Sequence, residues 1–281
     1  GTIGFIVAMW CTKLSGSKDN SNQFIIGAVG AIILGIFSFT LPKCPPPKSI
    51  AKDAGFAEQM GLQAFKLFGN YKMALFFLFS MLLGAALQLT NMYGDSFLTS
   101  FDKIEAFKDS FVVKYSTIIL SISQMSETLF ILTIPFFLKK FGIKKVMLFA
   151  MLAWVLRFGL FAYGDPTAMG TVHIILSCIV YGMAFDFFNI SGSLFVETST
   201  DSSIRSSAQG LFMMMTNGVG AWLGSTVSGM VIGKYYINAD GSSNWQGIWF
   251  AFAVYALVIA ILFAVLFKHK HVPEEVATVQ H

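Results

Sequence analysis

The chain has 281 residues, of which 55% are hydrophobic and only 12% are charged, and 30 of them are phenylalanine. Soluble domains carry about 25% charged residues, so this composition, with a mean hydropathy of +0.68, excludes an ordinary water-soluble protein. The formal net charge of +4 does not indicate nucleic-acid binding, because in a membrane protein the side on which the charges lie is more informative.

Long apolar runs recur along the chain. A bilayer core about 30 Å thick requires roughly 20 apolar residues in each helix that crosses it. The hydropathy therefore predicts eight membrane-spanning helices, at residues 1–11, 24–41, 73–92, 112–138, 146–163, 171–195, 210–233 and 249–267. The first run lacks the basic start and the cleavage site of a signal peptide, and the chain has no initiator methionine. We expect this run to be the later part of a helix in a longer protein.

The longest connection, residues 42–72, opens with the sequence PKCPPP. Such a stretch is stiff and extended and cannot start a helix at once. We interpret it as a cytoplasmic linker. It would join the last two helices of an N-terminal six-helix half (1–41) to a C-terminal six-helix half (73–267), which a cytoplasmic tail (268–281) follows.

The second half of the linker carries apolar residues among lysine and glutamate, namely Phe56, Leu62, Phe65 and Phe68. This pattern is compatible with an amphipathic helix on the inner membrane surface. An ordinary solvated linker explains it equally well.

Basic residues are distributed unevenly between the two sides of the membrane. If the linker and every second connection after it are cytoplasmic, that side holds twelve Lys and Arg residues and the opposite side holds six. The positive-inside rule therefore places the C-terminal tail in the cytoplasm. The tail has two alternate histidines, His269 and His271, but without a third ligand we assign no metal site to them.

Amide and ionisable side chains interrupt the apolar spans at few positions, and a charged one is costly in a bilayer. Gln88 and Asn91 come first, three residues apart near the outer end of their span. They could contact a polar ligand or cap the helix where water begins. The sequence favours neither interpretation.

Glu127 lies near the middle of the fourth span, with Gln124 one turn before it on the same face. The pair could serve only to hold helices together through hydrogen bonds. A buried carboxylate costs at least about 2.5 kcal/mol on insertion scales, however, so we favour a functional role. Arg157, two-thirds of the way along the next span, could snorkel, pair with a carboxylate or line a cavity, and we favour a structural role.

Asp186 stands beside a stripe of residues that recur every four positions, namely Tyr181, Phe185 and Asn189. Packing alone would explain the aromatic side chains. The carboxyl group is more specific, because one that alternates between protonated and ionised forms is what proton coupling requires.

The span at 210–233 holds six glycines, with alanine and serine between them. Such small residues let helices pack closely or slide past one another, and either role explains the pattern. Trp245 and Trp249 lie at a span end, where aromatic side chains anchor helices at the membrane surface.

Sequence signatures of enzymes and metal sites are missing. The chain has neither an H-E-x-x-H nor a G-x-S-x-G motif, and its three cysteines, Cys11, Cys44 and Cys178, form no paired pattern. We therefore predict that the chain is not an enzyme and holds no metal. The dispersed polar residues also favour a closed binding pocket over a continuous wet pore.

Several segments resemble a known family. The basic loop LKKFGIKK at 138–145 resembles the G-x-[RK]-[RK] motif between paired helices of the major facilitator superfamily. More specific are GTIGFI (1–6), QLTNMYG (88–94), SQMSETLF (123–130), GMAFDFFNISG (182–192) and SSAQG (206–210). Together, from Gly1 to the tail, these segments resemble the bacterial nucleoside:proton symporter family.

The resemblance implies an all-α membrane protein of the major facilitator fold, in which eight transmembrane helices of an expected twelve are present. The first four helices, and a basic pocket residue, would precede Gly1. It also implies proton-coupled import of nucleosides across the bacterial inner membrane by alternating access, with the full-length protein acting as a monomer. Its partners would be nucleosides, protons and the lipid bilayer rather than nucleic acid, and it would need no cofactor because the proton gradient is the driving force.

Residues that match the family's substrate pocket are Thr2, Phe5, Gln88, Asn91, Gln124, Glu127, Tyr181, Phe185 and Asp186. In our hypothesis the amides and Glu127 hydrogen-bond the ribose and the base edges, and the aromatic rings pack against the base. Asp186 and Glu127 are the candidates for proton coupling. Two alternatives stay open, a major facilitator carrier for another polar solute such as a sugar, and a membrane receptor or assembly subunit that does not transport.

Overall fold

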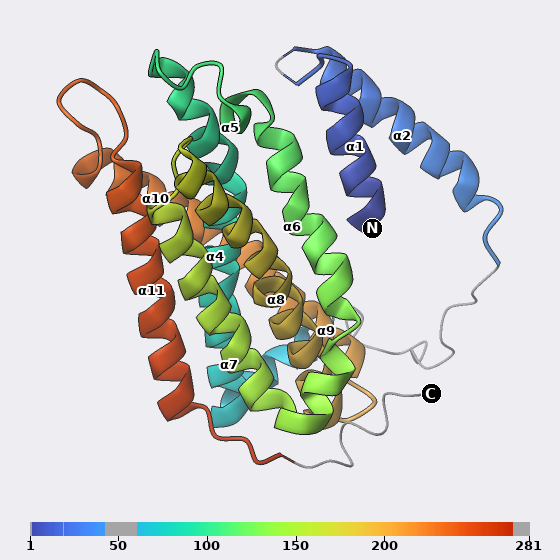
Figure 1. Cartoon of the computed structure of the whole chain (residues 1–281). Helices are drawn as coiled ribbons and strands as arrows, with labels where there is room; N and C mark the ends of the chain where they lie inside the picture. The colour runs from blue at the N-terminus through green and yellow to red at the C-terminus, as the bar shows by residue number, and fades with distance from the viewer. Residues whose placement is uncertain (1, 19, 43–60, 272–281) are drawn as a thin grey trace.

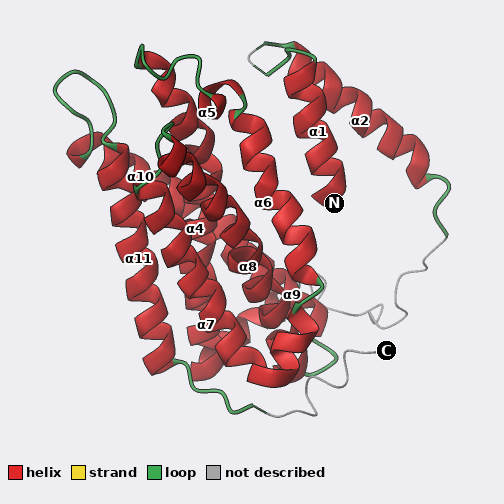
Figure 2. Ribbon diagram, viewed as in Figure 1, coloured by secondary structure: helices red, strands yellow, loops and turns green. Residues whose placement is uncertain are grey.

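Helices form nearly all of the regular structure in the computed structural model, which describes residues 2–18, 20–42 and 61–271 (Figure 1). Within these ranges the chain forms no sheet, and a single β-bridge joins Ile237 to Ser243 (Figure 2). The α-helices, in chain order, are α1 (Thr2–Leu14), α2 (Asn22–Ser38), α4 (Tyr71–Ser100), α5 (Phe111–Lys114), α6 (Ser116–Ile131), α7 (Ile134–Ala162), α8 (Ala168–Ser199), α9 (Arg205–Met213), α10 (Ala221–Tyr235) and α11 (Trp245–Leu266). The helices from α4 to α11 are called the bundle below.

By length and composition, four of the described helical stretches could each cross a membrane, namely Tyr71–Lys103, Ile134–Ala162, Ala168–Ser199 and Trp245–Leu266. The helices α1 and α2 are apolar but shorter. The predicted span 210–233 is divided, because a π-helical segment, η3 (Met214–Gly220), separates α9 from α10. Each predicted span nevertheless falls mainly on helix.

The predicted span 112–138 is wrong at its end. The helix α6 ends at Ile131 and α7 begins at Ile134, so the last predicted residues belong to the next helix. The cause is Pro135, which fits the first turn of a helix but not its interior. The loop predicted after this span is reduced to a sharp bend within α7 at Gly142, whose φ of 76° suits glycine.

Side-chain caps fix the starts of three long helices. Asn70 caps α4, Thr167 caps α8 and Asn244 caps α11, each by accepting a hydrogen bond from a backbone N–H of the first turn. The prediction for α4 was wrong at its other end, because this helix continues past residue 92 to Ser100.

Phenylalanine and tryptophan fill the centre of the bundle. Trp249 is completely buried and its ring contacts those of Phe97, Phe158 and Phe161. The prediction that Trp249 anchors the membrane surface is therefore wrong, because α11 begins four residues earlier and carries this side chain into the core.

Close helix contacts in the bundle depend on glycine. Gly182 of α8 meets α6, where a Cβ would lie 2.5 Å from the carbonyl carbon of Ser126. The Ser126 hydroxyl also donates to the Ile179 carbonyl across this contact. Gly220 and Gly224 meet α4 in the same way, whereas Gly210, Gly229 and Gly233 have nothing within 4 Å of an added Cβ. Part of the small-residue pattern therefore serves close packing.

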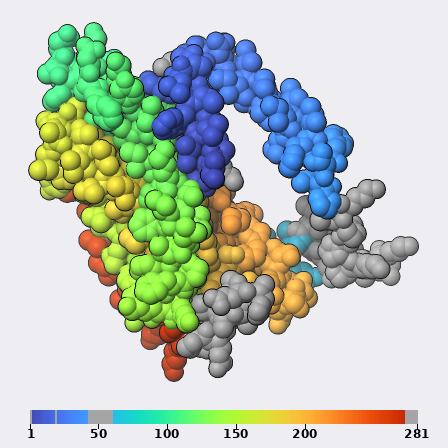
Figure 3. Space-filling view, turned by 45° about the vertical axis from the view of Figure 1, so that its right-hand side comes forward, coloured from blue at the N-terminus to red at the C-terminus, as the bar shows by residue number. Residues whose placement is uncertain are grey.

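The first two helices lie outside the bundle. The helix α1 packs against α6, and α2 contacts α1 and runs away from the bundle (Figures 1 and 3). Nearly every described residue of α2 is exposed, although the helix is apolar. The bundle therefore meets the first part of the chain mainly through α1.

The described part of the linker forms a 3-10 helix, η1 (Leu62–Gly69), which packs on α4 and α9. Phe68 contacts Phe77, with 5.3 Å between ring centroids, but Phe68, Leu62 and Phe65 are all exposed. Phe56 and Cys44 lie outside the described residues. Phe267, which follows α11, is buried, and in the tail His271 Nε2 lies 3.2 Å from the Lys139 carbonyl oxygen.

Candidate functional site

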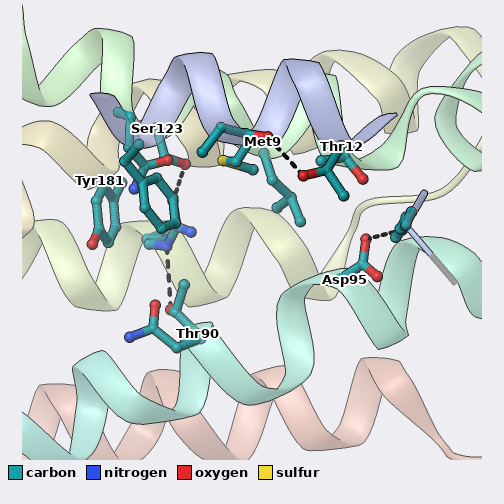
Figure 4. Close-up of a pocket in the computed structure, with 14 residues that line it drawn as sticks. Met9, Thr12, Thr90, Asp95, Ser123 and Tyr181 are labelled. Atoms are coloured by element: carbon teal, nitrogen blue, oxygen red, sulfur yellow. Dashed lines mark hydrogen bonds and ion pairs between the residues drawn. The ribbon is translucent and has the colours of Figure 1, made fainter. Parts of the chain in front are cut away.

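A cavity of about 400 Å³ lies between α1 and the bundle (Figure 4). Helices α1, α4, α6, α7 and α8 and the α1–α2 turn supply its wall, which is formed by Phe5, Ala8, Met9, Thr12, Lys18, Thr90, Asn91, Asp95, Thr117, Leu120, Ser123, Gln124, Arg157 and Tyr181. In Figure 4, Tyr181 and Ser123 lie at one end and Asp95 at the other, with Met9 and Thr12 along one side. The size and the mainly apolar wall with a few polar groups are typical of small-molecule sites.

Four of the nine predicted site residues lie on this wall. Asn91 and Gln124 provide amides from α4 and α6, and Phe5 and Tyr181 provide rings from α1 and α8. Amides offer both donors and acceptors, and rings offer apolar faces. The wall can thus bind a flat ring system that carries polar edges.

Glu127 and Thr2 form a polar contact between α6 and α1. The Thr2 hydroxyl donates to Glu127 Oε1 over 2.8 Å, and Glu127 is only 9% exposed. Neither side chain is part of the cavity wall. The contact therefore links the carboxyl group to the helix that closes the cavity.

Asp186 is buried in α8, at 6% exposure, and is not on the cavity wall. Its Oδ2 atom has no hydrogen-bond partner among the described residues. Glu127 lies on α6, which packs against α8. Because Gly182 and Ser126 bring α8 and α6 together within one turn of these positions, the fold groups the two carboxyl groups that the sequence singled out.

Gln88 and Phe185 also lie off the wall. Gln88 is half-buried in α4, one turn before Asn91. Phe185 stacks on Tyr181, with 5.9 Å between centroids and an interplanar angle of 4°, and it borders a separate small cavity beside Trp154. The structure therefore places Phe185 behind a wall residue.

Arg157 is a wall residue for which the sequence favoured a structural role. It is 1% exposed, and its Nη1 donates to the Ser177 carbonyl over 2.8 Å. Longer hydrogen bonds, each of 3.4 Å, join Nη1 to Ser123 and Nε to Thr90 (Figure 4). Arg157 thus links α7 to α4, α6 and α8, as expected for a structural role. It also lines the cavity, a role that the sequence interpretation considered but did not favour.

An ion pair at the cavity rim was not predicted. Lys18 Nζ lies 2.8 Å from Asp95 Oδ1, and the Ser116 hydroxyl donates to the same oxygen over 3.1 Å. Lys18 was assigned to a connection, and Asp95 lies beyond the predicted end of its span. The signal that could have revealed the ion pair was the acidic residue three positions after the predicted end of the span. A longer helix brings this residue to the cavity.

A family model described as "Nucleoside H+ symporter" matches residues 1–272. The xanthosine permease of Escherichia coli K12 is 56% identical over 276 residues, which cover 98% of this chain and 65% of the permease. The nucleoside permeases NupG of E. coli K12 and Shigella flexneri are each 56% identical over 283 residues, which cover 100% of this chain and 67% of the permease. All of these relatives are permeases, and none is an enzyme.

Crystal structures of the nucleoside transporter NupG have the same fold. A mutant form superposes with a TM-score of 0.86 over 95% of this chain, and another structure with 0.82 over 96%, both at 56% sequence identity. Each match covers 66% of the NupG chain. The chain therefore spans about two thirds of the length of its relatives, within the major facilitator fold.

Proposed function

Because the chain belongs to the nucleoside H+ symporter family, we propose that it takes part in the import of nucleosides together with protons, by alternating access. It is an all-helical, multi-pass membrane protein. The cavity between α1 and the bundle is the observation that carries the proposal, because its volume, amides and rings suit a nucleoside.

Nucleoside binding divides between the polar and the aromatic residues of the site. Asn91 and Gln124 hydrogen-bond ribose hydroxyls and base edges, and Phe5 and Tyr181 pack on the faces of the base. Stacking tolerates different bases because every base has a π-face. Gln88 and Phe185 support this wall from behind, and Thr2 holds Glu127 toward α1.

Proton coupling rests on the buried carboxyl groups of Glu127 and Asp186. A proton bound there neutralises a charge that is costly in the bilayer, so the loaded carrier reorients more readily than the half-loaded one. Reorientation moves α1 relative to α6, which breaks and re-forms contacts such as the hydrogen bond between Thr2 and Glu127.

The site of action in this proposal is the bacterial inner membrane, with the C-terminal tail in the cytoplasm and the full-length protein acting as a monomer. The distribution of Lys and Arg between the connections supports this orientation. The ion pair between Lys18 and Asp95 then lies at the outer mouth of the cavity. The proton gradient drives transport, and no cofactor takes part.

Uptake of labelled uridine by the full-length protein, in cells without other nucleoside carriers, tests the proposal. We expect concentrative uptake that a proton uncoupler abolishes. Uncoupler-insensitive concentration would rule out proton coupling. Competition by sugars but not by nucleosides would instead indicate a sugar carrier, and binding without flux in reconstituted vesicles would indicate a receptor.

A further inference from the structure

Arg157 carries a buried positive charge whose observed hydrogen-bond partners are all neutral. They are two hydroxyl groups and one backbone carbonyl, and its guanidinium carbon also lies 4.5 Å from the centroid of the Tyr181 ring and 5.0 Å from that of Phe161. The ion pairs of the described residues, which join Lys18 to Asp95 and Arg205 to Glu197, do not include it. A charge in the middle of a membrane helix is costly, so this one requires a reason.

The charge balance of the cavity wall is positive because of Arg157. Three of the residues that line the cavity are charged, namely Lys18, Asp95 and Arg157. Lys18 and Asp95 balance each other at 2.8 Å. Arg157 is therefore the wall charge without an ion-pair partner among the described residues.

Other titratable groups surround Arg157 without forming an ion pair with it. Tyr181 and Cys178 of α8 are its close neighbours. The carboxyl groups of Glu127 on α6 and Asp186 on α8 are not on the cavity wall, and neither forms an ion pair with Arg157. Arg157 is therefore the cation of the cavity wall that no carboxylate on the wall balances.

We propose that Arg157 is a specificity-determining residue that lets the cavity accept nucleosides whose base is an anion near neutral pH. This inference rests on the proposed function. Guanidinium groups donate in a planar fork that matches planar oxygen anions. Two of the three hydrogen bonds of Arg157 are long, at 3.4 Å, so a ligand oxygen can replace them at little cost.

Xanthosine and inosine are a matched pair of probes for this role. They share the ribose and the purine ring system, but the second oxo group of xanthosine makes its base acidic enough to ionise near neutral pH. Inosine stays neutral over the same range. Stacking on Phe5 and Tyr181 is common to both. The second oxo group is present at every pH, so a change in their relative affinity with pH isolates the charge.

The experiment measures competition by each nucleoside against labelled uridine in the full-length protein, at pH 7.5 and at pH 5. In the unaltered protein we expect the affinity for xanthosine, relative to inosine, to fall as the pH falls and xanthosine becomes neutral. Taking the ratio at each pH removes the effect of pH on proton coupling. At pH 7.5, Arg157→Gln should weaken xanthosine relative to inosine by roughly tenfold or more, as expected for the loss of a charge-assisted hydrogen bond. Arg157→Lys, which keeps the charge, should lose less.

Two results would overturn the inference while leaving the proposed function intact. One is an equal change for both nucleosides in Arg157→Gln, and the other is a ratio in the unaltered protein that does not depend on pH. The second decides the matter even if the variant does not reach the membrane. Absence of uridine uptake by the unaltered protein would overturn the proposed function, and this inference with it.

Discussion

The two carboxyl groups of the site differ in their partners. Glu127 accepts a hydrogen bond from Thr2 on the neighbouring helix, whereas Asp186 Oδ2 has no partner among the described residues. A buried carboxyl oxygen without a partner is costly unless the group binds a proton during its work. Asp186 is thus the stronger candidate for binding the coupling proton. The hydrogen bond of Glu127 depends instead on the position of α1.

Asp186→Asn in the full-length protein should abolish concentrative uptake, because the amide keeps the shape of the side chain but cannot release a proton. Exchange of labelled for unlabelled nucleoside at equal concentrations should persist. Asp240→Asn is the matched control, since Asp240 is an exposed carboxylate between α10 and α11, whose pKa is lowered by hydrogen bonds from Ser242. Normal accumulation by the Asp186 variant, at equal amounts in the membrane, would remove this residue from the mechanism.

Thr2→Val should weaken nucleoside binding about fivefold, which corresponds to about 1 kcal/mol for the loss of one hydrogen bond to Glu127. Valine keeps the size of the side chain but cannot donate. Thr2→Ser keeps the hydroxyl and should behave like the unaltered protein in the same competition assay. Equal weakening by both variants would mean that the methyl group, rather than the hydrogen bond, matters.

At the residue scale, the sequence predicted which polar side chains are buried better than it predicted which of them line the cavity. The cost of buried polar groups singled out Glu127 and Asp186, and both are buried. That cost could not tell whether a side chain points into the cavity, because this depends on how α6 and α8 rotate in the bundle. Arg157 and Asp95 reach the wall for the same reason, and spacing along the chain does not reveal it.

Among the elements, the crossing of α6 and α8 controls the geometry of the site. Gly182 allows the contact, and Ser126 bonds across it to the Ile179 carbonyl. A side chain at position 182 would meet backbone, which cannot move as a flexible side chain can. The crossing therefore sets the separation of Glu127 and Asp186.

Gly182→Ala should destabilise the protein by about 1–3 kcal/mol, because the added methyl group would lie 2.5 Å from a backbone carbon of α6. Thermal unfolding in detergent, followed by the loss of uridine binding, measures the effect. Gly229→Ala is the control, because nothing lies within 4 Å of a Cβ at that position in α10. Equal melting temperatures for the two variants would show that the crossing can relax.

Helix existence was predictable from hydropathy, but two kinds of break were not. The end of α6 depends on Pro135, which lies within an apolar run that looks continuous by hydropathy alone. The η3 segment was not predictable from hydropathy either, because a π-helical turn is a rare local change inside an otherwise apolar helix. Trp249 was misplaced because an aromatic residue near a span end suits both a membrane anchor and a core position.

In the whole molecule, α1 forms one wall of the cavity and the bundle forms the rest. Polar contacts hold α1 and the turn after it in place. Thr2 bonds to Glu127, Trp10 Nε1 donates to Ser121 over 2.9 Å, and Lys18 pairs with Asp95. These contacts run along the length of α1, so a rocking motion that opens the cavity at Lys18 must break the ion pair first.

Asp95→Asn should raise the population in which the cavity is open at the end near Lys18 by up to about fivefold, because a partly exposed ion pair contributes at most about 1 kcal/mol. Labelling of Thr12→Cys on the cavity wall by a membrane-impermeant thiol reagent measures this opening, in a background where Cys11 is Ser. Restoring an ion pair of reversed polarity, with Lys18→Asp and Asp95→Lys together, should return labelling toward its original rate. Unchanged labelling in Asp95→Asn would show that the pair does not hold the cavity closed.

The π-helical turn η3 lets one helix carry a surplus residue, because such a turn is wider than an α-helical one. The surplus is absorbed locally, so α9 stays against α8 and α10 stays against α4. The fold can accommodate a one-residue deletion within 214–220, because the segment can then become an ordinary α-helix. The same deletion inside α8 would rotate every later residue by about 100° and turn its buried face outward. Insertions and deletions among related carriers should therefore be tolerated at η3 and excluded from α8. The π-helical turn is then the part of the bundle where the length of the sequence can vary most easily.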